Sequence, residues 1–377
     1  MHICMITGEQ FPQVYGGIGN YIYNLSKILL ARGYDVTILT RGSIFRKCYK
    51  TKLDTIEIWK IRYFPIYPFH VRVHGYFLNK ILLKNEKKFD VIHMHSPLVP
   101  SLKTNLPVIV TEHGTVQGVI SNSVNQDLSS IFTKIFSKEF IALDQAVLSN
   151  ADVVTTVSNS CMHEIKTMIP EKKELYVIEN AVDTNLFRPD PNRERDKKTI
   201  LYAGRLDSGK GISDLILSGK EVCKKFPDAK FILAGKGPNL GYLKRLIVKL
   251  KLTENFLFTG YLNQKELLHL YQSSTMYVLP SYHEGLPTGL LEAMSCGLPS
   301  IATDVSGCSE VIINNENGIL VQPKCPEDLS LKIINLLESQ DDRDRLAKSA
   351  RDHIINNYDW NKVADKIENI YHSLKLN

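Results

Sequence analysis

The chain has 377 residues, of which 44% are hydrophobic and 23% are charged. This composition excludes wholesale disorder, a collagen-like repeat and a coiled coil, and the length suits two domains of ordinary size. No stretch of the sequence approaches the roughly 18 apolar residues that a membrane-spanning helix needs.

The first residues, MHICMITGEQF, contain no basic region and no long apolar core, so we expect no cleaved signal peptide. The seven cysteines are scattered and include no C-x-x-C pair. Such usage predicts reduced thiols in a cytoplasmic protein and argues against a disulfide framework or a structural zinc site.

The formal net charge is +6, but it is unevenly distributed. Residues 41–88 contain 12 Lys and Arg against 3 Asp and Glu, a net charge of +9, so the rest of the chain carries −3. A locally basic segment indicates a local anionic partner.

Short apolar, β-branched runs alternate with longer amphipathic segments, a pattern typical of parallel sheets covered by helices. In the first half, strands are predicted over 2–7, 35–40, 90–93, 107–111, 153–156 and 175–178. In the second half, strands are predicted over 199–203, 230–234, 255–258, 276–279, 300–302 and 318–321. A helix over 19–32 is expected to end at Gly33. The two arrays predict an α/β protein with two Rossmann-like domains.

The expected domains are 1–187 and 199–357, joined by a linker at 188–198. Two prolines and dense charge make this linker a poor helix or strand. Residues 358–377 are predicted to form a separate amphipathic C-terminal helix.

The first candidate motif is Gly16-Gly17-Ile18-Gly19, which precedes a predicted helix. Glycines let the backbone approach a phosphate closely, and a helix N-terminus offers free N–H groups. The spacing departs from the dinucleotide fingerprint G-x-G-x-x-G, which directly follows its strand. The residues alone therefore leave two interpretations open, a phosphate-binding loop and a plain flexible loop.

The second motif, 204–211, follows a predicted strand directly and reads GRLDSGKG. Arg205 can grip a diphosphate through its planar fork, and Lys210 can act as a point charge. The alternative is a pair of solvated surface cations, which the glycines and the strand-end position disfavour.

The third motif, 281–297, reads SYHEGLPTGLLEAMSCG. Pro287 can begin a helix that Gly297 ends, with Glu284 in the loop before it and Glu292 inside it. Two carboxylates in these positions can bind the hydroxyl groups of a sugar or ribose. The alternative is one carboxylate that stabilises the helix dipole and a second that is merely solvated.

The segment from 284 to 312 and the following NGILVQP resemble the donor-site signature of retaining glycosyltransferases of family four. Further motifs match the same family in the same order: AGRLDSGKGISDLI, LAGKGP, FTGYLNQKELLHLYQSSTMYVLPS and ENAVDTNLFRP. The match extends from the Gly16-Gly17 loop to the terminal YDWNKVADKIENIY. The resemblance implies the GT-B fold, in which an N-terminal acceptor-side domain and a donor-binding domain face a cleft. It also implies that the C-terminal helix crosses back to the N-terminal domain.

The resemblance implies roles for individual residues of the second half. Glu284 matches the glutamate that contacts the transferred sugar, and Glu292 matches the one that holds the ribose. Arg205 and Lys210 match the basic pair that binds the diphosphate. The backbone of Leu286 and Thr288, at the helix start, matches the segment that faces the phosphates.

In the first half, Gly16 and Gly17 match the loop that closes over the phosphates, and His113 in TEHG matches the histidine beside the donor sugar. His93 is better explained as a core histidine, whereas His95 is equally consistent with a contact to the acceptor. The acidic cluster at 341–344 lies far from the motifs and is interpreted as a solvated helix face.

The implied activity is transfer of a hexose-type sugar, with retention, from a UDP- or GDP-sugar to an acceptor hydroxyl. Acceptors in this family include glycolipids, lipid-linked oligosaccharides and polysaccharide precursors. The resemblance implies no tightly bound cofactor, no protein ligands for a metal and no nucleic-acid partner, while Mg²⁺ can accompany the diphosphate. Two alternatives are a nucleotide-sugar epimerase of the same fold and a non-catalytic nucleotide-sugar-binding protein; a nicotinamide oxidoreductase fits less well.

The sequence also predicts a basic amphipathic helix over 76–88. One side of this helix carries four lysines, Lys80, Lys84, Lys87 and Lys88. The other side carries four apolar residues, Phe77, Leu78, Ile81 and Leu82. Such a helix can bind anionic lipid headgroups at the inner face of a membrane, or it can be an ordinary domain helix that buries its apolar side. Both interpretations stay open at this point, as do the base, the sugar and the acceptor.

Overall fold

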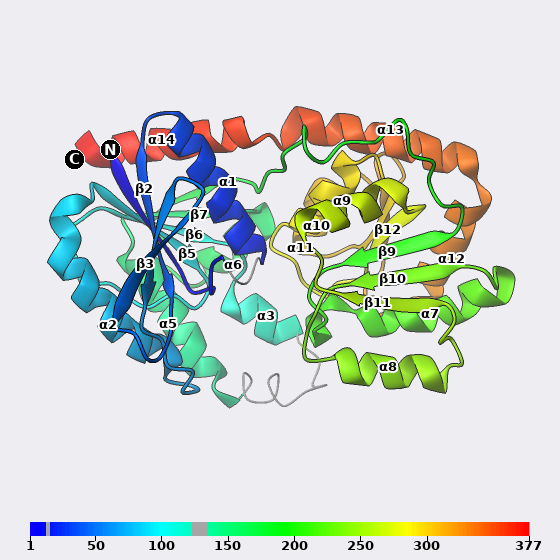
Figure 1. Cartoon of the computed structure of the whole chain (residues 1–377), viewed down its shortest axis with the longest axis horizontal. Helices are drawn as coiled ribbons and strands as arrows, with labels where there is room; N and C mark the ends of the chain where they lie inside the picture. The colour runs from blue at the N-terminus through cyan, green and yellow to red at the C-terminus, as the bar shows by residue number, and fades with distance from the viewer. Residues whose placement is uncertain (13–15, 123–134, 377) are drawn as a thin grey trace. The chain divides into compact units, whose positions relative to one another are not determined.

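The computed structural model describes residues 1–12, 16–122 and 135–376, and the chain divides into two compact units. Of the described residues, the first unit contains 1–12, 16–120, 135–180 and 360–376, and the second contains 121–122 and 181–359. Each unit contains a β-sheet with helices packed against it (Figure 1).

The first unit contains an eight-stranded sheet in the order β3-β4-β2-β1-β5-β6-β7-β8, in which only the β3–β4 pair among the described strands is antiparallel. Its strands are β1 (His2–Thr7), β2 (Asp35–Arg41), β3 (Cys48–Leu53), β4 (Ile56–Ile61), β5 (Val91–Ser96), β6 (Val108–Glu112), β7 (Val153–Thr156) and β8 (Glu174–Val177). Its helices are α1 (Gly17–Ala31), α2 (His70–Asn85), η1 (Glu86–Lys88), α3 (Val116–Asn122), α5 (Ser137–Asn150), α6 (Asn159–Lys166) and α14 (Trp360–Leu376).

The second unit contains a six-stranded parallel sheet in the order β11-β10-β9-β12-β13-β14. Its strands are β9 (Thr199–Ala203), β10 (Lys230–Ala234), β11 (Phe256–Gly260), β12 (Met276–Leu279), β13 (Ser300–Thr303) and β14 (Ile319–Val321). Its helices are η2 (Ser208–Lys210), α7 (Ile212–Lys225), α8 (Leu240–Lys249), α9 (Gln264–Ser273), α10 (Thr288–Ser295), α11 (Ser306–Val311), α12 (Pro326–Glu338) and α13 (Gln340–Asn357).

All twelve predicted strands are present. Parallel strands that are covered on both faces consist of continuous apolar runs, and TILYA in β9 is an example that is buried along its whole length. Strands β3 and β4 were not predicted from the sequence. The β3 sequence CYKTKL carries exposed lysines at alternate positions and forms an edge of the sheet. Lysines blunt an edge strand against unwanted pairing, and here they concealed the strand signal within the basic segment.

Two helix ends follow the prediction closely. After α1, Gly33 adopts φ +86°, and the N–H groups of Gly33 and Tyr34 donate to the carbonyls of Leu30 and Leu29. Gly297 ends α10 in the same way, with φ +61° and the N–H of Leu298 bonded to the carbonyl of Ala293. Both are Schellman motifs, which satisfy the last carbonyls of a helix and favour glycine at the left-handed position.

The segment 188–198, predicted as a linker, contains neither helix nor strand and packs on the second unit. Arg195 donates to the carbonyls of Tyr271, Ser274, Cys296 and Gly297. The compact units divide at 180/181, which is seven residues before the expected start of the linker.

The C-terminal helix α14 belongs to the first unit, where it packs along α1 (Figure 1). Arg32, just after α1, pairs with Asp365 at 2.7 Å and with Glu368 at 3.0 Å. In the buried contact, Tyr371 Oη lies 2.7 Å from Nδ1 of His93 on β5. The predicted return of this helix to the N-terminal unit is therefore confirmed.

Candidate active site

In the second unit, the strand order reverses between β9 and β12, because β10 lies on the other side of β9 and β13 on the other side of β12. Open α/β sheets bind ligands outside the carboxyl ends of their strands at such a switch point. The loops that leave β9 and β12 are 204–211 and 280–287, which contain the second and third sequence motifs.

An ion pair joins these two loops. Nζ of Lys210 lies 2.7 Å from Oε1 of Glu284, with only 25% and 10% of the two side chains exposed. Ser281 donates a hydrogen bond to the same carboxylate oxygen at 2.6 Å. Burial opposes the charge of Lys210, but the carboxylates of Glu284 and Asp207 outweigh it and raise its pKa above the usual value. The lysine therefore stays cationic, and the structure brings together two residues that lie 74 positions apart.

The backbone holds the two loops in close contact. The N–H of Tyr282 donates to the carbonyl of Gly209 at 2.8 Å. Gly211 adopts φ +59°, and a Cβ at this position would lie 1.9 Å from the carbonyl oxygen of Pro280. Only glycine permits this approach, so the second glycine of the GKG sequence fixes Lys210 against the loop that carries Glu284.

Arg205, the other half of the predicted cation pair, lies apart from this ion pair. Its side chain is 74% exposed and its Nε lies 3.4 Å from Oδ2 of Asp207. Arg205 is therefore available to a ligand in solution, while Lys210 is already held in place by a carboxylate.

Helix α10 begins directly after the loop that carries Glu284, with Pro287 as its N-cap and no side-chain cap. The first N–H groups of a helix have no partner within it, and helix starts of this type bind anions in other proteins. Leu286 is 4% exposed and anchors the loop in the core.

Glu292 lies one turn along α10 and is 7% exposed. Its Oε2 accepts a hydrogen bond from the hydroxyl of Tyr271 at 3.1 Å. Glu292 is the residue predicted to bind hydroxyl groups, but the contact with Tyr271 was not predicted, because the spacing does not reveal which residue of α9 faces α10.

We expect Glu292→Ala to weaken nucleoside diphosphate binding by about 10- to 100-fold, because a charge-assisted hydrogen-bond pair contributes about 1.5–3 kcal/mol. Calorimetric titration of the nucleotide measures this. Tyr271→Phe is the matched control, since it removes the internal hydrogen bond of Glu292 but keeps the carboxylate. Equal losses in the two variants, or unchanged affinity in Glu292→Ala, would contradict a direct ribose contact.

The first unit has its own switch point between β1 and β5, since β2 lies beside β1 and β6 lies beside β5. Gly16 and Gly17 stand at the N-terminus of α1, near the end of β1. Oε2 of Glu9 accepts from the N–H of Gly19 at 2.8 Å, and a Cβ on Gly16 would lie 2.4 Å from Oε1 of Glu9. An internal carboxylate thus occupies the helix terminus that the sequence analysis assigned to phosphate, and the first strand and this helix start are bonded through it.

His113 follows β6 and forms a chain with a second histidine. Its Nε2 lies 3.2 Å from Nδ1 of His95, and its ring packs edge-on against Tyr21 of α1 at 4.8 Å. Desolvation lowers the pKa of His113 to about 3, so the imidazole is neutral at physiological pH. His95 is fully buried, which places it beneath His113 and not on the surface open to an acceptor.

His93 is a core histidine, in line with the preferred interpretation. Its two ring nitrogens bond to Tyr371 and to Thr111 at 2.7 and 2.6 Å, and burial lowers its pKa to about 3.

The sequence did not predict a buried pair of carboxyl groups, one of which belongs to the TEHG sequence. Glu112 and Asp144 are 0% and 3% exposed, and Ser96 donates to Oδ1 of Asp144 at 3.0 Å. Burial and the adjacent Asp144 raise the pKa of Glu112 well above its usual value. Glu112 accepts from the N–H of Gly114, so this pair supports the loop that carries His113.

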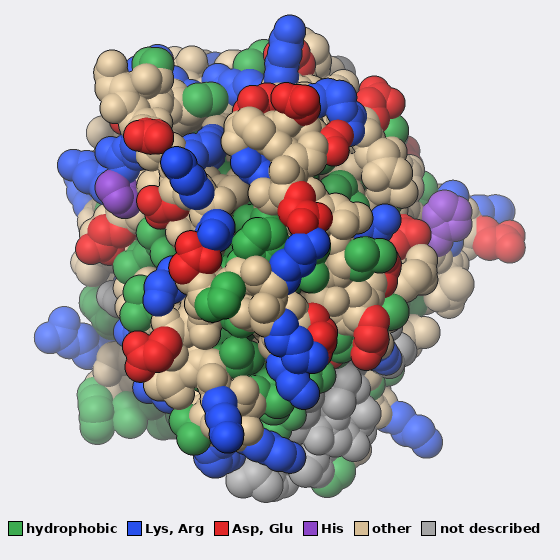
Figure 2. Space-filling model, turned by 90° about the vertical axis from the view of Figure 1, so that its right-hand side faces the viewer, with side chains coloured by type: hydrophobic (Ala, Val, Ile, Leu, Met, Phe, Trp, Pro, Cys, Tyr) green, Lys and Arg blue, Asp and Glu red, His purple; other side chains and the backbone are tan. Residues whose placement is uncertain are grey.

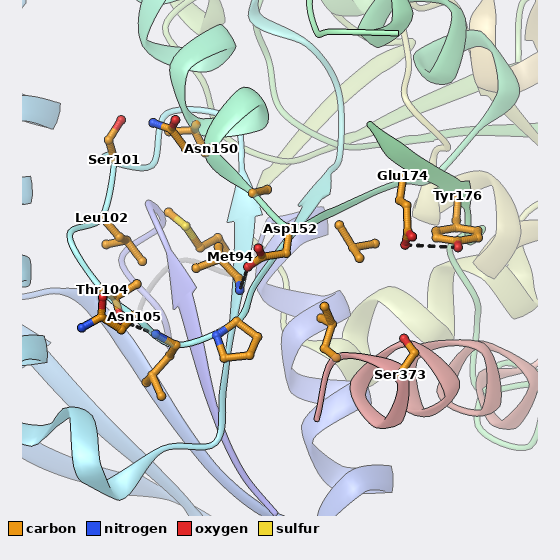
Figure 3. A pocket seen from close by; sticks show the side chains of 17 residues that line it. Met94, Ser101, Leu102, Thr104, Asn105, Asn150, Asp152, Glu174, Tyr176 and Ser373 are labelled. Atoms are coloured by element: carbon orange, nitrogen blue, oxygen red, sulfur yellow. Dashed lines mark hydrogen bonds between the residues drawn. The ribbon is translucent and has the colours of Figure 1, made fainter. Parts of the chain in front are cut away.

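A cavity of about 630 Å³ lies elsewhere in the first unit, where β6, β7 and β8 begin (Figure 3). Its polar groups are partly satisfied within the protein: Tyr176 bonds to Glu174, and Asp152 accepts from the N–H of Val108. It lies at the amino ends of the strands and contains none of the predicted site residues, so we do not place the active site there.

Within residues 1–12, 16–122 and 135–376, no group of three or more His, Cys, Asp or Glu side chains could hold a metal ion. In the same part of the chain, no helix is both long enough and apolar enough to cross a membrane.

Comparison with known families agrees with this fold. Residues 15–186 match Glycosyltransferase Family 4, and residues 183–353 match Glycosyl transferases group 1. The chain belongs to this glycosyltransferase family and has the GT-B fold.

Individual relatives cover nearly the whole chain. An uncharacterized glycosyltransferase of Methanocaldococcus jannaschii is 28% identical, with 98% of each chain covered. A component of human phosphatidylinositol N-acetylglucosaminyltransferase is 27% identical, with 98% of this chain and 75% of the relative covered. Two solved structures share the fold. Sucrose-phosphate synthase of Thermosynechococcus elongatus superposes with a TM-score of 0.86 at 22% identity, with 99% of this chain and 98% of that chain covered. Anabaena HepE in complex with UDP and glucose superposes with a TM-score of 0.77 at 17% identity, with 99% of this chain and 100% of that chain covered.

Proposed function

We propose that this glycosyltransferase moves a hexose-type sugar from a nucleoside diphosphate donor to an acceptor hydroxyl, with retention at the anomeric carbon. The observation that carries the proposal is the Lys210–Glu284 ion pair at the switch point of the second unit. A fixed cation beside an uncapped helix start is suited to the negative charge that grows on a departing diphosphate. The solved HepE complex with UDP and glucose supports a nucleotide-sugar donor.

In this proposal, the diphosphate is bound by the side chains of Lys210 and Arg205. The backbone at the start of α10, around Leu286 and Thr288, binds it as well. Glu292 holds the ribose, and Glu284 contacts the transferred sugar as well as fixing Lys210. The family resemblance assigns Gly16 and Gly17 to the phosphates, which then compete with the Glu9 carboxylate for this helix start, and it assigns the neutral imidazole of His113 to the sugar. Mg²⁺ is not required, because the cations of the chain supply the charge.

A donor-hydrolysis screen tests this function. The full chain is incubated separately with UDP- and GDP-linked glucose, N-acetylglucosamine, galactose and mannose, and release of the free nucleotide is measured. One donor should be hydrolysed far faster than the others, and the released sugar should keep the anomeric configuration of the donor. Isomerisation of a donor without hydrolysis would instead indicate an epimerase, and binding without turnover would indicate a non-catalytic protein.

We further propose that the acceptor is lipid-linked and that the protein acts at the inner face of a membrane, attached through the basic segment 41–88. The phosphatidylinositol N-acetylglucosaminyltransferase relative supports a lipid acceptor. On the face shown in Figure 2, basic and acidic side chains are interspersed and form no patch of a single sign. The proposed attachment rests on the basic excess of residues 41–88.

The structure changes how the predicted helix over 76–88 would act. Helix α2 ends at Asn85, so Lys87 and Lys88 lie in the 3₁₀ turn η1. Leu78 and Leu82 are fully buried in the core of the first unit, so the apolar side of α2 cannot insert into lipid. The exposed apolar side chains available to lipid come from other positions: Phe45 is 84% exposed, Ile66 54%, Phe69 52%, Tyr76 64% and Leu83 56%.

Co-sedimentation with vesicles containing anionic lipid tests this attachment. We expect binding at low salt that weakens in high salt and is lost in a Lys80/Lys84/Lys87/Lys88→Glu variant, since each cation near the surface contributes about 1 kcal/mol. The matched control reverses four exposed lysines of the second unit: Lys244, Lys249, Lys265 and Lys348. Binding that ignores salt and both variants, or no binding at all, would contradict the proposal.

A further inference from the structure

Arg41, the last residue of β2, extends its guanidinium to the switch point of the first unit. Its Nη2 lies 3.5 Å from the carbonyl oxygen of Leu98, in the loop after β5. A Cβ on Gly8, in the loop after β1, would lie 3.3 Å from the same nitrogen. The guanidinium therefore lies between the loops that leave β1 and β5, where an open α/β sheet binds its ligand.

The hydrogen bonds of Arg41 are incomplete. Its two described hydrogen bonds, to Leu98 and to the hydroxyl of Tyr63, are both 3.5 Å long, and its Nε is buried without a partner among the described residues. Arg41 forms no ion pair within 4.0 Å with a carboxylate that the structure describes. Glu9 influences it from further away, while that carboxylate accepts from the N–H of Gly19. Burying a cation without a close anion is costly unless a ligand supplies one.

Two imidazoles complete the surroundings of Arg41. The Tyr63 ring lies under the guanidinium at 4.5 Å, and His70 and His74 pack edge-on against the same ring at 6.2 and 5.7 Å. Nδ1 of His70 is buried without a partner in the described chain. Burial and the charge of Arg41 lower the pKa of both histidines to about 4, so each is neutral and carries one N–H. The cluster therefore offers donors and one permanent positive charge.

The loop after β5, which contacts Arg41, is strained. Leu98 adopts φ +62°, a left-handed conformation that leucine rarely takes. Its carbonyl is one of the two groups bonded to Arg41. Strained residues concentrate at ligand sites, where the surrounding structure holds them in place.

We propose that Arg41 binds an anionic group of the acceptor, of the phosphate class, with His70 and the Tyr63 hydroxyl as further contacts. This inference rests on the proposed function, because it assigns the switch point of the first unit to the acceptor. A phosphate suits the cluster better than a carboxylate, because its tetrahedral oxygens can meet donors arriving from different directions, whereas a carboxylate pairs in one plane.

Binding is tested on the full chain with arginine labelled in ¹⁵N. The Nε–H signal of Arg41 is assigned by its absence from the Arg41→Gln spectrum. Addition of inorganic phosphate should shift this signal saturably, whereas acetate at the same ionic strength should shift it at least threefold less. The signal of Arg46, which is exposed five residues further on, is the internal control. An unmoved Arg41 signal, or equal shifts for Arg41 and Arg46, would overturn the proposal.

The source of the phosphate is distinguished by repeating the titration with glycerol 3-phosphate and with micellar lysophosphatidic acid. A response to either supports the site, and a stronger response to the micelles indicates a lipid acceptor; a response to neither overturns it. Arg46→Gln, which removes an exposed arginine outside the cluster, should leave the response of the Arg41 signal unchanged. If the wild type hydrolyses no nucleotide sugar but the Arg41 signal still shifts, the transferase proposal fails and the anion site stands.

Discussion

Lys210→Ala is expected to lower kcat by about 100- to 1,000-fold, the cost of removing one preorganised donor from a developing anion. Lys210 is well placed for this role because Glu284 holds its ammonium group at 2.7 Å and keeps it protonated. As negative charge grows on the leaving diphosphate, a fixed cation stabilises the transition state more than the bound donor. Turnover of the donor identified by the hydrolysis screen is the measurement.

Three further variants make the Lys210 test specific. Lys265→Ala removes an exposed lysine of α9 and should leave turnover unchanged. Arg205→Ala should lower turnover by less than Lys210→Ala, because its 74% exposed side chain must first be ordered by the ligand. Lys210→Arg keeps the charge and should recover part of the activity. A Lys210→Ala enzyme that melts like wild type and turns over like Lys265→Ala would show that the diphosphate binds elsewhere.

His113→Ala is expected to reduce kcat by at least about 100-fold while the affinity for the nucleoside diphosphate stays within about twofold. The reason is that the imidazole is neutral and its Nε2 is engaged with His95, so Nδ1 is the ring nitrogen left for a ligand. Loss of one hydrogen bond to the reacting sugar lowers the rate without touching the nucleotide. Single-turnover kinetics and calorimetry separate the two quantities.

The pH profile gives a second test of the same histidine. Because burial lowers the pKa of His113 to about 3, the imidazole stays neutral as the pH falls through 6.5 and gains a proton only near pH 3. No acid limb near pH 6.5 should therefore depend on His113. Parallel losses of turnover and nucleotide affinity in His113→Ala, with a lowered melting temperature, would instead identify a structural histidine.

Helices and strands were predicted from the sequence far better than the contacts between side chains. The strands around the site were predictable because their apolar runs are bounded by glycines, and Gly33 and Gly297 mark helix ends that need a left-handed residue. In contrast, Lys210 has an acidic neighbour in Asp207, and only the folded chain shows that it bonds to Glu284, 74 residues away. Spacing along a chain carries no information on such contacts between loops.

The same limit explains the residues that were missed. Arg41 belongs to a basic segment whose exposed members, such as Lys50, obscured its separate position at the end of β2. Glu9 and Asp144 lie in stretches without a motif, yet one bonds to the start of α1 and the other supports the TEHG loop. Each of these contacts joins one element to another through the folded unit, and spacing along the chain does not reveal it.

The placement of α14 determines how this enzyme can be cut and recombined. The chain returns to the first unit at 360 after residues 181–359, and residues 121–122 also group with the second unit, so the second unit is not simply a C-terminal half. A fragment that stops at 180 would lack Tyr371, which forms a hydrogen bond with His93. It would also lack Trp360, whose ring centre lies 5.2 Å from that of Tyr21. A chimaera that exchanges residues 181–359 must therefore keep the last helix with the N-terminal sequence against which it packs.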